Sequence, residues 1–332
     1  MMVRSGRVAV GTLGGTITMV GGQGGGRPTL GAAELMSGLM GGLGDDIRVE
    51  GETLAQLPGA SLTPQLLCDA VGWARDRVAD GCAGAVLVQG TDTLPESAFL
   101  TDLYWAGDAP LVLTGAMRLA SAVSADGPGN LRDACLAAET NEVARQGVVV
   151  CLGGQLHRAT RVEKAHSWST DAFTSGPAGL AGVVREGAVR LYSDGGRQGA
   201  AALTSPVRDP RVLLLQTYLG DDARTLEHVV QDEDVDAVVV EGFGGGHVPA
   251  RVADVLVEAA GAMPVVVATS AHRGGTLQRT YGFPGSEMDL LERGVLLGGE
   301  LSARKTRLLL WAYLAQGEPS TGGSLEALLQ HY

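Results

Sequence analysis

The sequence predicts an α/β protein of two domains. We expect a larger N-terminal domain with a doubly wound, mostly parallel sheet and a smaller C-terminal α/β domain. Short apolar runs alternate with segments of helical periodicity, a pattern typical of parallel sheets with helices on both faces. The 50 glycines suit many tight turns between strands and helices. A length of 332 residues also favours two domains over one.

The N-terminal domain is expected to span residues 1–193. Apolar runs predict strands near 7–11, 84–88, 110–114 and 147–151, and the patterns between them predict helices near 63–80, 95–105 and 130–142. Residues 180–193 are typical of a hairpin that turns at Glu186 and Gly187.

A linker and a second alternating series follow. Residues 194–210 are rich in Gly, Ala, Pro and charged residues, as expected of a connection between domains. Beyond them, strands are expected at 211–216, 236–241 and 264–269, and helices at 222–231, 249–260 and 302–316. The C-terminal domain is therefore expected to span 211–332.

Composition argues against several classes of function. The net charge of −12 disfavours nucleic acid and anionic membrane as partners. We find no apolar run of membrane-spanning length and no secretory signal, so we expect a cytoplasmic protein. The cysteines lack the spacing of metal ligands and are expected to be reduced thiols of the core, namely Cys68, Cys82, Cys135 and Cys151. We expect neither a metal nor a cofactor.

Two strand–turn motifs carry the residues most suited to chemistry. The first apolar run leads into GTLGGTI at residues 11–17, and the run at 85–88 leads into QGTDT at residues 89–93. Both place threonines at the carboxyl end of a strand, where open α/β sheets bind ligands. Taken alone, each Thr could simply cap a turn or a helix. A phosphate loop is disfavoured, because the glycine spacing is wrong and no Gly-Lys-Ser/Thr follows.

Six blocks in the same order resemble the L-asparaginase/glutaminase family of amidohydrolases. Besides the two motifs, the matching blocks are PLVLTGAMR (110–118), ADGPGNL (125–131), RVEKAHSWSTDAFTS (161–175) and EGFGGGHVP (241–249). The resemblance implies a two-step hydrolysis in which Thr16 attacks a carboxamide, ammonia leaves, and water hydrolyses the acyl-enzyme. It also implies that Thr91, Asp92 and Lys164 move the protons.

The resemblance leaves the direction of proton transfer open. Lys164 can accept a proton only where burial or a neighbouring cation favours the neutral amine, and Asp92 favours the ammonium instead. Backbone N–H groups near Thr91 and Ala116 are candidates for an oxyanion hole. Structural roles are expected for three other polar residues, Asp126, His157 and His166.

The chain departs from the family where an amino-acid substrate would bind. The family holds the α-carboxylate and α-ammonium with a Ser and a Gln or Glu. Here those positions fall on Gly59 and Ala60, or on Ala60 and Ser61 if the alignment shifts by one residue. The usual His before the second motif is Gln89.

Two further parts of the site are implied by the resemblance alone. A lid loop follows the first motif and lacks the family's Tyr; its candidate residues are Gly21, Gly24, Arg27 and Thr29. The family's Glu, which reaches the α-ammonium in a neighbouring subunit, matches Glu287, so a homodimer or homotetramer is expected.

The sequence therefore favours one function and keeps two others open. The favoured function is hydrolysis of L-asparagine or a related side-chain amide. The first alternative is a specialised amidase or hydrazide hydrolase that acts on a larger or non-amino-acid substrate. The second is a metabolite-binding homologue without catalysis, which the retention of all four catalytic candidates disfavours. With the amino-acid contacts missing, we expect a KM for L-asparagine in the millimolar range or above.

Overall fold

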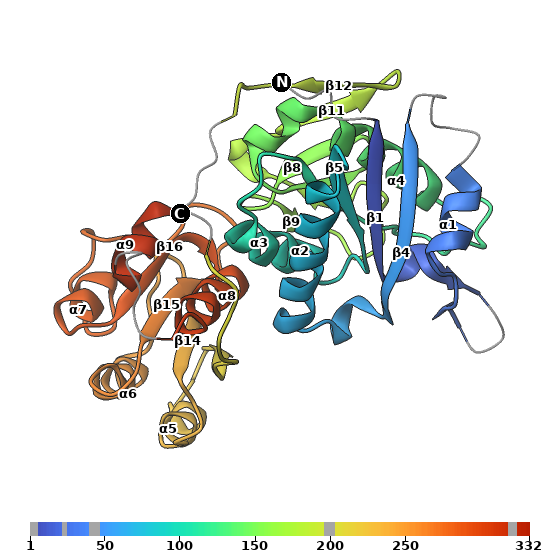
Figure 1. Ribbon diagram of the computed structural model, residues 1–332. Coiled ribbons are helices and arrows are strands. Elements are labelled where there is room, and N and C mark those ends of the chain that lie inside the picture. Colours follow the sequence, from blue (N-terminus) through green and yellow to red (C-terminus); the bar gives the residue numbers. More distant parts are fainter. Residues whose placement is uncertain (1–5, 22–24, 40–46, 196–202, 318–323) are drawn as a thin grey trace. The chain divides into compact units, whose positions relative to one another are not determined.

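The chain forms two α/β units, each built on a mainly parallel sheet (Figure 1), which confirms the predicted fold class. The computed structural model describes residues 6–21, 25–39, 47–195, 203–317 and 324–332. Unit 1 comprises Met1–Gln198 and unit 2 comprises Gly199–Tyr332. The division lies within residues 194–210, the predicted linker.

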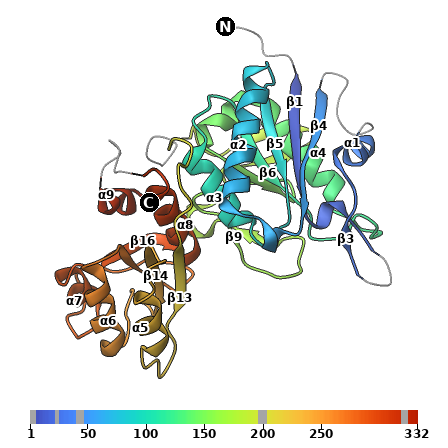
Figure 2. The same cartoon turned by 60° about the horizontal axis from the view of Figure 1, so that its bottom comes forward.

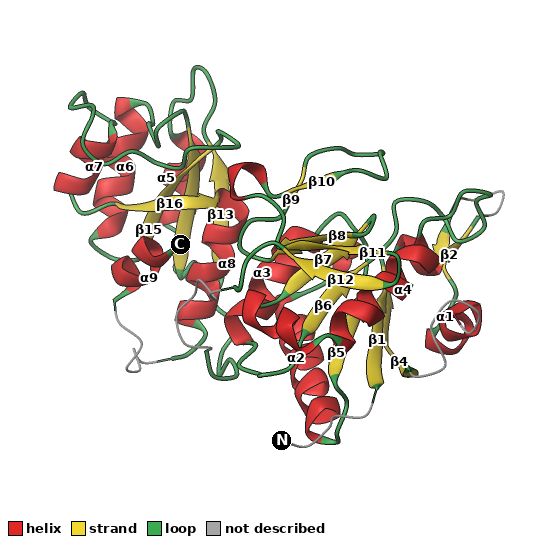
Figure 3. Cartoon of the chain, turned by 90° about the horizontal axis from the view of Figure 1, so that it is seen from above, coloured by secondary structure: helices red, strands yellow, loops and turns green. Residues whose placement is uncertain are grey.

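Unit 1 is organised by an eight-stranded sheet of order β12-β11-β8-β7-β6-β5-β1-β4 (Figure 3). The strands of its parallel part are β4 (Arg48–Leu57), β1 (Arg7–Gly14), β5 (Gly84–Val88), β6 (Leu111–Thr114) and β7 (Val149–Leu152). Each strand beyond β7 is antiparallel to its neighbour: β8 (Gln155–Arg158), β11 (Gly182–Arg185) and β12 (Ala188–Leu191). Glu186 and Gly187 turn the β11–β12 hairpin with positive φ, as predicted.

Helices cover both faces of this sheet. α1 (Ala32–Leu39) and α4 (Gly127–Glu139) share a core with alternate residues of the strands, such as Val8 and Val10. Gly11 therefore points to the other face, since successive residues of a strand alternate. There its Cα lies against Trp73 of α2 (Pro64–Ala79). α3 (Leu94–Tyr104) lies beside α2 on that face, as Figure 1 and Figure 2 show.

Short elements complete unit 1. Its 3₁₀ turns are η1 (Thr16–Thr18), η2 (Gly59–Ser61), η3 (Asn141–Gln146) and η4 (Gly176–Ala178). Two small antiparallel pairs lie outside the main sheet: β2 (Met19–Val20) with β3 (Arg27–Pro28), and β9 (Glu163–Lys164) with β10 (Phe173–Thr174).

Unit 2 contains a four-stranded parallel sheet with its own apolar core. Its strands are β13 (Val212–Gln216), β14 (Ala237–Gly242), β15 (Val265–Thr269) and β16 (Leu296–Ser302). Its helices are α5 (Arg224–Val230), α6 (Ala250–Ala260), α7 (Glu287–Glu292), α8 (Ala303–Leu314) and α9 (Leu325–His331). Across the described ranges of both units, no helix has the length and apolar character needed to cross a bilayer.

Candidate active site

Three loops at the carboxyl ends of β1, β4 and β5 meet backbone to backbone. A Cβ on Gly15 would lie 2.1 Å from the backbone nitrogen of Gly90, and a Cβ on Gly90 would lie 2.7 Å from that of Gly59. No side chain fits in these gaps, so glycine is what allows the loops to approach so closely. Thr16 follows Gly15 and Thr91 follows Gly90, and the contact therefore brings both threonine motifs to one edge of the sheet.

Lys164 lies against the second motif. Its Nζ donates hydrogen bonds to Thr91 Oγ1 at 3.0 Å and to Asp92 Oδ1 at 2.7 Å. Thr91 is buried, and the side chains of Lys164 and Asp92 are 15% and 74% exposed. Because Asp92 is so exposed, the ion pair adds little to stability and its geometry matters more for the site. The structure thus brings together three of the four residues for which we predict a catalytic role.

Thr16 occupies the first position of η1 and is partly buried. Gly15 caps this turn: its carbonyl oxygen accepts hydrogen bonds from the backbone N–H of Thr18 at 3.0 Å and from its hydroxyl at 2.7 Å. Within the described chain the Thr16 hydroxyl itself has no hydrogen-bond partner. It is therefore held by its backbone, beside the loop of Thr91.

The loop after β6 packs on Thr91. A Cβ on Gly115 would lie 3.2 Å from the methyl group of Thr91, and Ala116 is buried directly after it. The carboxylate of Asp126 orders this loop by accepting hydrogen bonds at 2.9 Å from the backbone N–H groups of Met117 and Arg118. The expected structural role of Asp126 is confirmed.

The recognition loop, residues 57–64, provides little polar chemistry. Gly59 is buried, whereas Ala60 and Ser61 are exposed. A Cβ on Gly59 would lie 3.1 Å from the carbonyl oxygen of Gly90, so even a serine would require the Gly90 loop to shift slightly. None of the three positions carries a charged side chain for either end of an amino acid.

Two further contacts at this edge are not predicted by the sequence. The hydroxyl of Thr93 donates to the carbonyl of Gly59 at 2.9 Å and ties the second motif to η2. Its membership of the QGTDT motif was the available signal. The amide of Gln89, which replaces the family's His, donates to Ser97 Oγ at 3.0 Å and to the carbonyl of Gly90 at 3.2 Å. Both contacts fix the glycine junction.

Glu287 is fully buried within unit 2. Its Oε1 accepts hydrogen bonds from the backbone N–H groups of Thr280 at 2.7 Å and Tyr281 at 2.6 Å, and His247 Nε2 lies 3.0 Å from Oε2. Burial raises the pKa of this carboxyl, but the hydrogen bonds lower it, and the net shift is downward. Glu287 therefore has a structural role in its own unit. Its part in a neighbour's site stays a prediction.

The lid candidates are only partly described. The backbone N–H of Gly21 donates to Ser121 Oγ at 3.0 Å, and that of Thr29 donates to the carbonyl of Thr18 at 3.0 Å. Arg27 belongs to β3, and only its backbone is described. Gly24 lies outside the described residues.

All four cysteines are free thiols, as expected, although Cys68 is only partly buried. Burial raises the pKa of Cys68 and of Cys135 to about 12, so neither forms a thiolate at neutral pH. Considering the described residues alone, no three His, Cys, Asp or Glu side chains are grouped so as to hold a metal ion.

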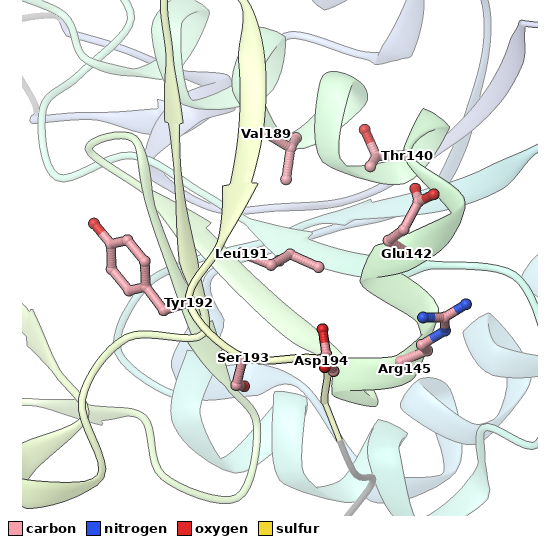
Figure 4. A pocket seen from close by; sticks show the side chains of 8 residues that line it. All are labelled: Thr140, Glu142, Arg145, Val189, Leu191, Tyr192, Ser193 and Asp194. Carbon is pink, nitrogen blue, oxygen red and sulfur yellow. The ribbon is translucent and has the colours of Figure 1, made fainter.

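Two cavities of unit 1 can be described by the residues that line them. One of about 330 Å³ opens between η3 and β12 (Figure 4). It lies beyond the C-terminal end of α4, and the 13 residues of that helix span about 20 Å. The other, of about 130 Å³, is lined by Ile17, which follows Thr16, and by Gly127 and Pro128 at the start of α4. The smaller cavity is therefore the one next to the candidate site.

Comparisons with known families match both units. Residues 7–195 match the family described as Asparaginase, N-terminal, and residues 211–322 match the Glutaminase/Asparaginase C-terminal domain.

Individual relatives agree with this assignment. The chain is 35% identical over 243 residues to a probable L-asparaginase of Deinococcus radiodurans, covering 73% of this chain and 74% of the relative. It is 29% identical to an L-asparaginase of Bacillus licheniformis, covering 82% and 84%. The crystal structure of a probable cytoplasmic L-asparaginase from Campylobacter jejuni superposes with a TM-score of 0.86 at 25% identity, covering 98% and 99%. The chain belongs to the asparaginase family of hydrolases, which act on amide C–N bonds.

Proposed function

We propose that the chain hydrolyses L-asparagine or a closely related side-chain amide to the acid and ammonia, through an acyl-enzyme on Thr16. The observation that carries the proposal is the contact of Lys164 Nζ with Thr91 at 3.0 Å and with Asp92 at 2.7 Å. Thr91 and Asp92 lie on the loop against which Gly15 packs. A nucleophile candidate and a proton-transfer group therefore flank one position at the sheet edge, as acyl transfer requires.

The proposed reaction has two steps. In the first, the Thr16 oxygen attacks the carboxamide carbon, and its proton passes toward Thr91 and Lys164. Backbone N–H groups near Thr91 and Ala116 stabilise the oxyanion. The C–N bond then breaks as the nitrogen takes a proton, and ammonia leaves. In the second step, water attacks the ester on Thr16, gives up a proton to the same relay, and releases the acid.

Ammonia release from a panel of amides tests this proposal. We expect turnover of at least one side-chain amide by the purified chain, and a loss of about a hundredfold or more in Thr16→Ala, since a nucleophile is removed. Thr16→Ser keeps a hydroxyl and should retain part of the rate. Near-normal turnover by Thr16→Ala would contradict the assignment and make Thr91 the next candidate nucleophile.

A second candidate, a specialised amidase, is favoured by the recognition loop. Gly59 is packed on Gly90, and Ala60 and Ser61 offer no charge. Binding a charged group at a site without partners is costly. Loss of two charge-assisted hydrogen bonds, each worth about 1.5–3 kcal/mol, would weaken binding of an amino acid by more than about a hundredfold.

The KM for L-asparagine distinguishes the two candidates. If the chain is a specialised amidase, its KM for L-asparagine should be in the millimolar range or above. Its kcat/KM for an uncharged aliphatic amide should then be at least equal to that for L-asparagine. A micromolar KM for L-asparagine would exclude the amidase, because it would show that other residues bind the charged ends.

We also propose a homodimer or homotetramer in the cytoplasm. The proposal rests on the match of Glu287 to the family residue that completes a neighbouring subunit's site. Loops of unit 2 also expose large apolar side chains, namely Tyr218, Leu219, Phe243, Leu277, Tyr281 and Phe283. One structural relative is described as cytoplasmic and one sequence relative as periplasmic. Sedimentation at micromolar concentration tests the assembly, and a fully active monomer would contradict it.

A further inference from the structure

The hairpin that carries Lys164 is joined to the main sheet by a buried side-chain pair. His157 lies on β8, and its Nδ1 is 2.8 Å from the hydroxyl oxygen of Ser175. His157 is 1% exposed and Ser175 is 5% exposed. Ser175 directly follows β10, the strand that pairs with β9. The pair therefore links the main sheet to the end of the small β9–β10 sheet.

The strand register transmits this link to Lys164. In the antiparallel pair, Phe173 lies opposite Lys164, and Ser175 is only two residues beyond Phe173. A second backbone contact closes the hairpin, because the N–H of Ala165 donates to the carbonyl of Ala172 at 2.7 Å. Fixing Ser175 thus fixes the strand against which Lys164 is held.

The face of the sheet is consistent with this arrangement. Leu156 belongs to the core under α4, so His157, the next residue of β8, points to the opposite face. β9 contacts α3, which covers that face. An exposed bond between Gln155 Nε2 and Asp171 Oδ1, 3.4 Å long, is a weaker tie to the hairpin.

We propose that His157 is a positioning residue: its hydrogen bond to Ser175 holds the β9–β10 hairpin so that Lys164 Nζ stays within reach of Thr91. This inference rests on the proposed role of Lys164. Burial lowers the pKa of His157 to about 4, although Asp171 raises it, so the ring is neutral when the protein is near pH 7. A neutral ring keeps one nitrogen as acceptor and one as donor, and the bond to Ser175 does not depend on a charge.

Variants of both partners test the link in the full-length chain. His157→Leu and Ser175→Ala remove the bond, whereas His157→Asn can keep a polar atom near the place of Nδ1. We expect kcat to fall about tenfold or more in the first two, with KM within about twofold, because misplacement of a catalytic group acts on the chemical step. His157→Asn should restore most of the rate.

A matched control separates positioning from loss of stability. Thr306 is fully buried in unit 2, and its hydroxyl donates to the carbonyl of Ser302 at 3.0 Å. Thr306→Val should lower the thermal midpoint while changing kcat by less than about twofold. Hydrogen exchange adds a readout that does not need activity: amides of residues 163–175 should exchange faster in His157→Leu but not in Thr306→Val.

A double-mutant cycle with Lys164→Met decides the matter. If His157 acts through Lys164, then His157→Leu causes no further loss of kcat once Lys164 is replaced. Independent, multiplying losses, or a normal kcat in folded His157→Leu, would overturn the inference. Full activity of Lys164→Met would instead overturn the proposed proton relay itself, and the two failures are thereby distinguished.

Discussion

Gly15 is under the strongest steric constraint among the residues of the site. Its φ of 86° and ψ of −174° lie in a region that is essentially confined to glycine, and a Cβ would stand 2.1 Å from the nitrogen of Gly90. We expect Gly15→Ala to lower the free energy of unfolding by about 2 kcal/mol or more and to remove most activity. Urea unfolding and the amide assay measure the two effects.

Gly25 offers a control for Gly15. It has the same φ of 86°, but a Cβ there would meet nothing within 4 Å. Gly25→Ala should therefore cost only the backbone strain, about 1 kcal/mol. Equal destabilisation by the two substitutions would mean that strain, and not the approach to Gly90, sets the requirement for glycine.

Lys164 and Asp92 should differ in importance although they form one ion pair. We expect Lys164→Met to lower kcat by about a hundredfold or more, because the group in contact with Thr91 is lost. Asp92→Asn should cost less, since its side chain is 74% exposed and water can replace part of its effect. Circular dichroism should show both variants folded. A larger loss in Asp92→Asn than in Lys164→Met would reverse the assigned roles.

At the scale of the elements, β8 gives unit 1 a pH-dependent stability. The pKa of His157 falls from 6.5 to about 4 on folding. Between these values the unfolded chain binds the proton and the folded chain does not, so stability is full above pH 6.5 and falls as the pH drops toward 4. Urea unfolding should show a loss of about 2 kcal/mol from pH 7 to pH 5 due to this residue. The same pH slope in His157→Leu would exclude it as the cause.

Most elements could be predicted because their patterns are local. The residues of β5 are all buried and apolar, and the same holds for nearly all of β15. β4 was missed because it is an edge strand with mostly exposed polar residues. α7 has only six residues, and its start depends on the Ser286 side chain as cap and on buried Glu287, which no periodicity reveals.

The candidate site could be predicted in its residues but not in its contacts. Thr91 and Lys164 are 73 residues apart in the sequence. Only the family resemblance predicted that they act together. The link from His157 to Ser175 spans 18 residues, and although Ser175 ends the block 161–175, nothing in the sequence pairs it with His157. The close contact of Gly15 with Gly90 likewise depends on the order of β1 and β5 in the sheet, which follows from tertiary packing.

For the whole molecule, Glu287 decides between a role inside one chain and a role between chains. A carboxylate with three donors in its own unit cannot be released without leaving those donors unpaired. We therefore expect Glu287→Gln to lower the thermal midpoint, with a cost of about 1–3 kcal/mol, whereas a change in KM tests the predicted part in a neighbouring subunit's site.

Glu292→Gln, an exposed change at the end of the same helix, should alter neither quantity. Both variants are compared at a concentration where sedimentation shows one oligomeric state, because dissociation alone would also lower the midpoint. A raised KM in Glu287→Gln with an unchanged midpoint would place this carboxylate in a neighbouring subunit's site. The contacts to Thr280, Tyr281 and His247 would then have to rearrange when the subunits assemble, which hydrogen exchange over residues 276–287 would detect as a difference between monomer and oligomer.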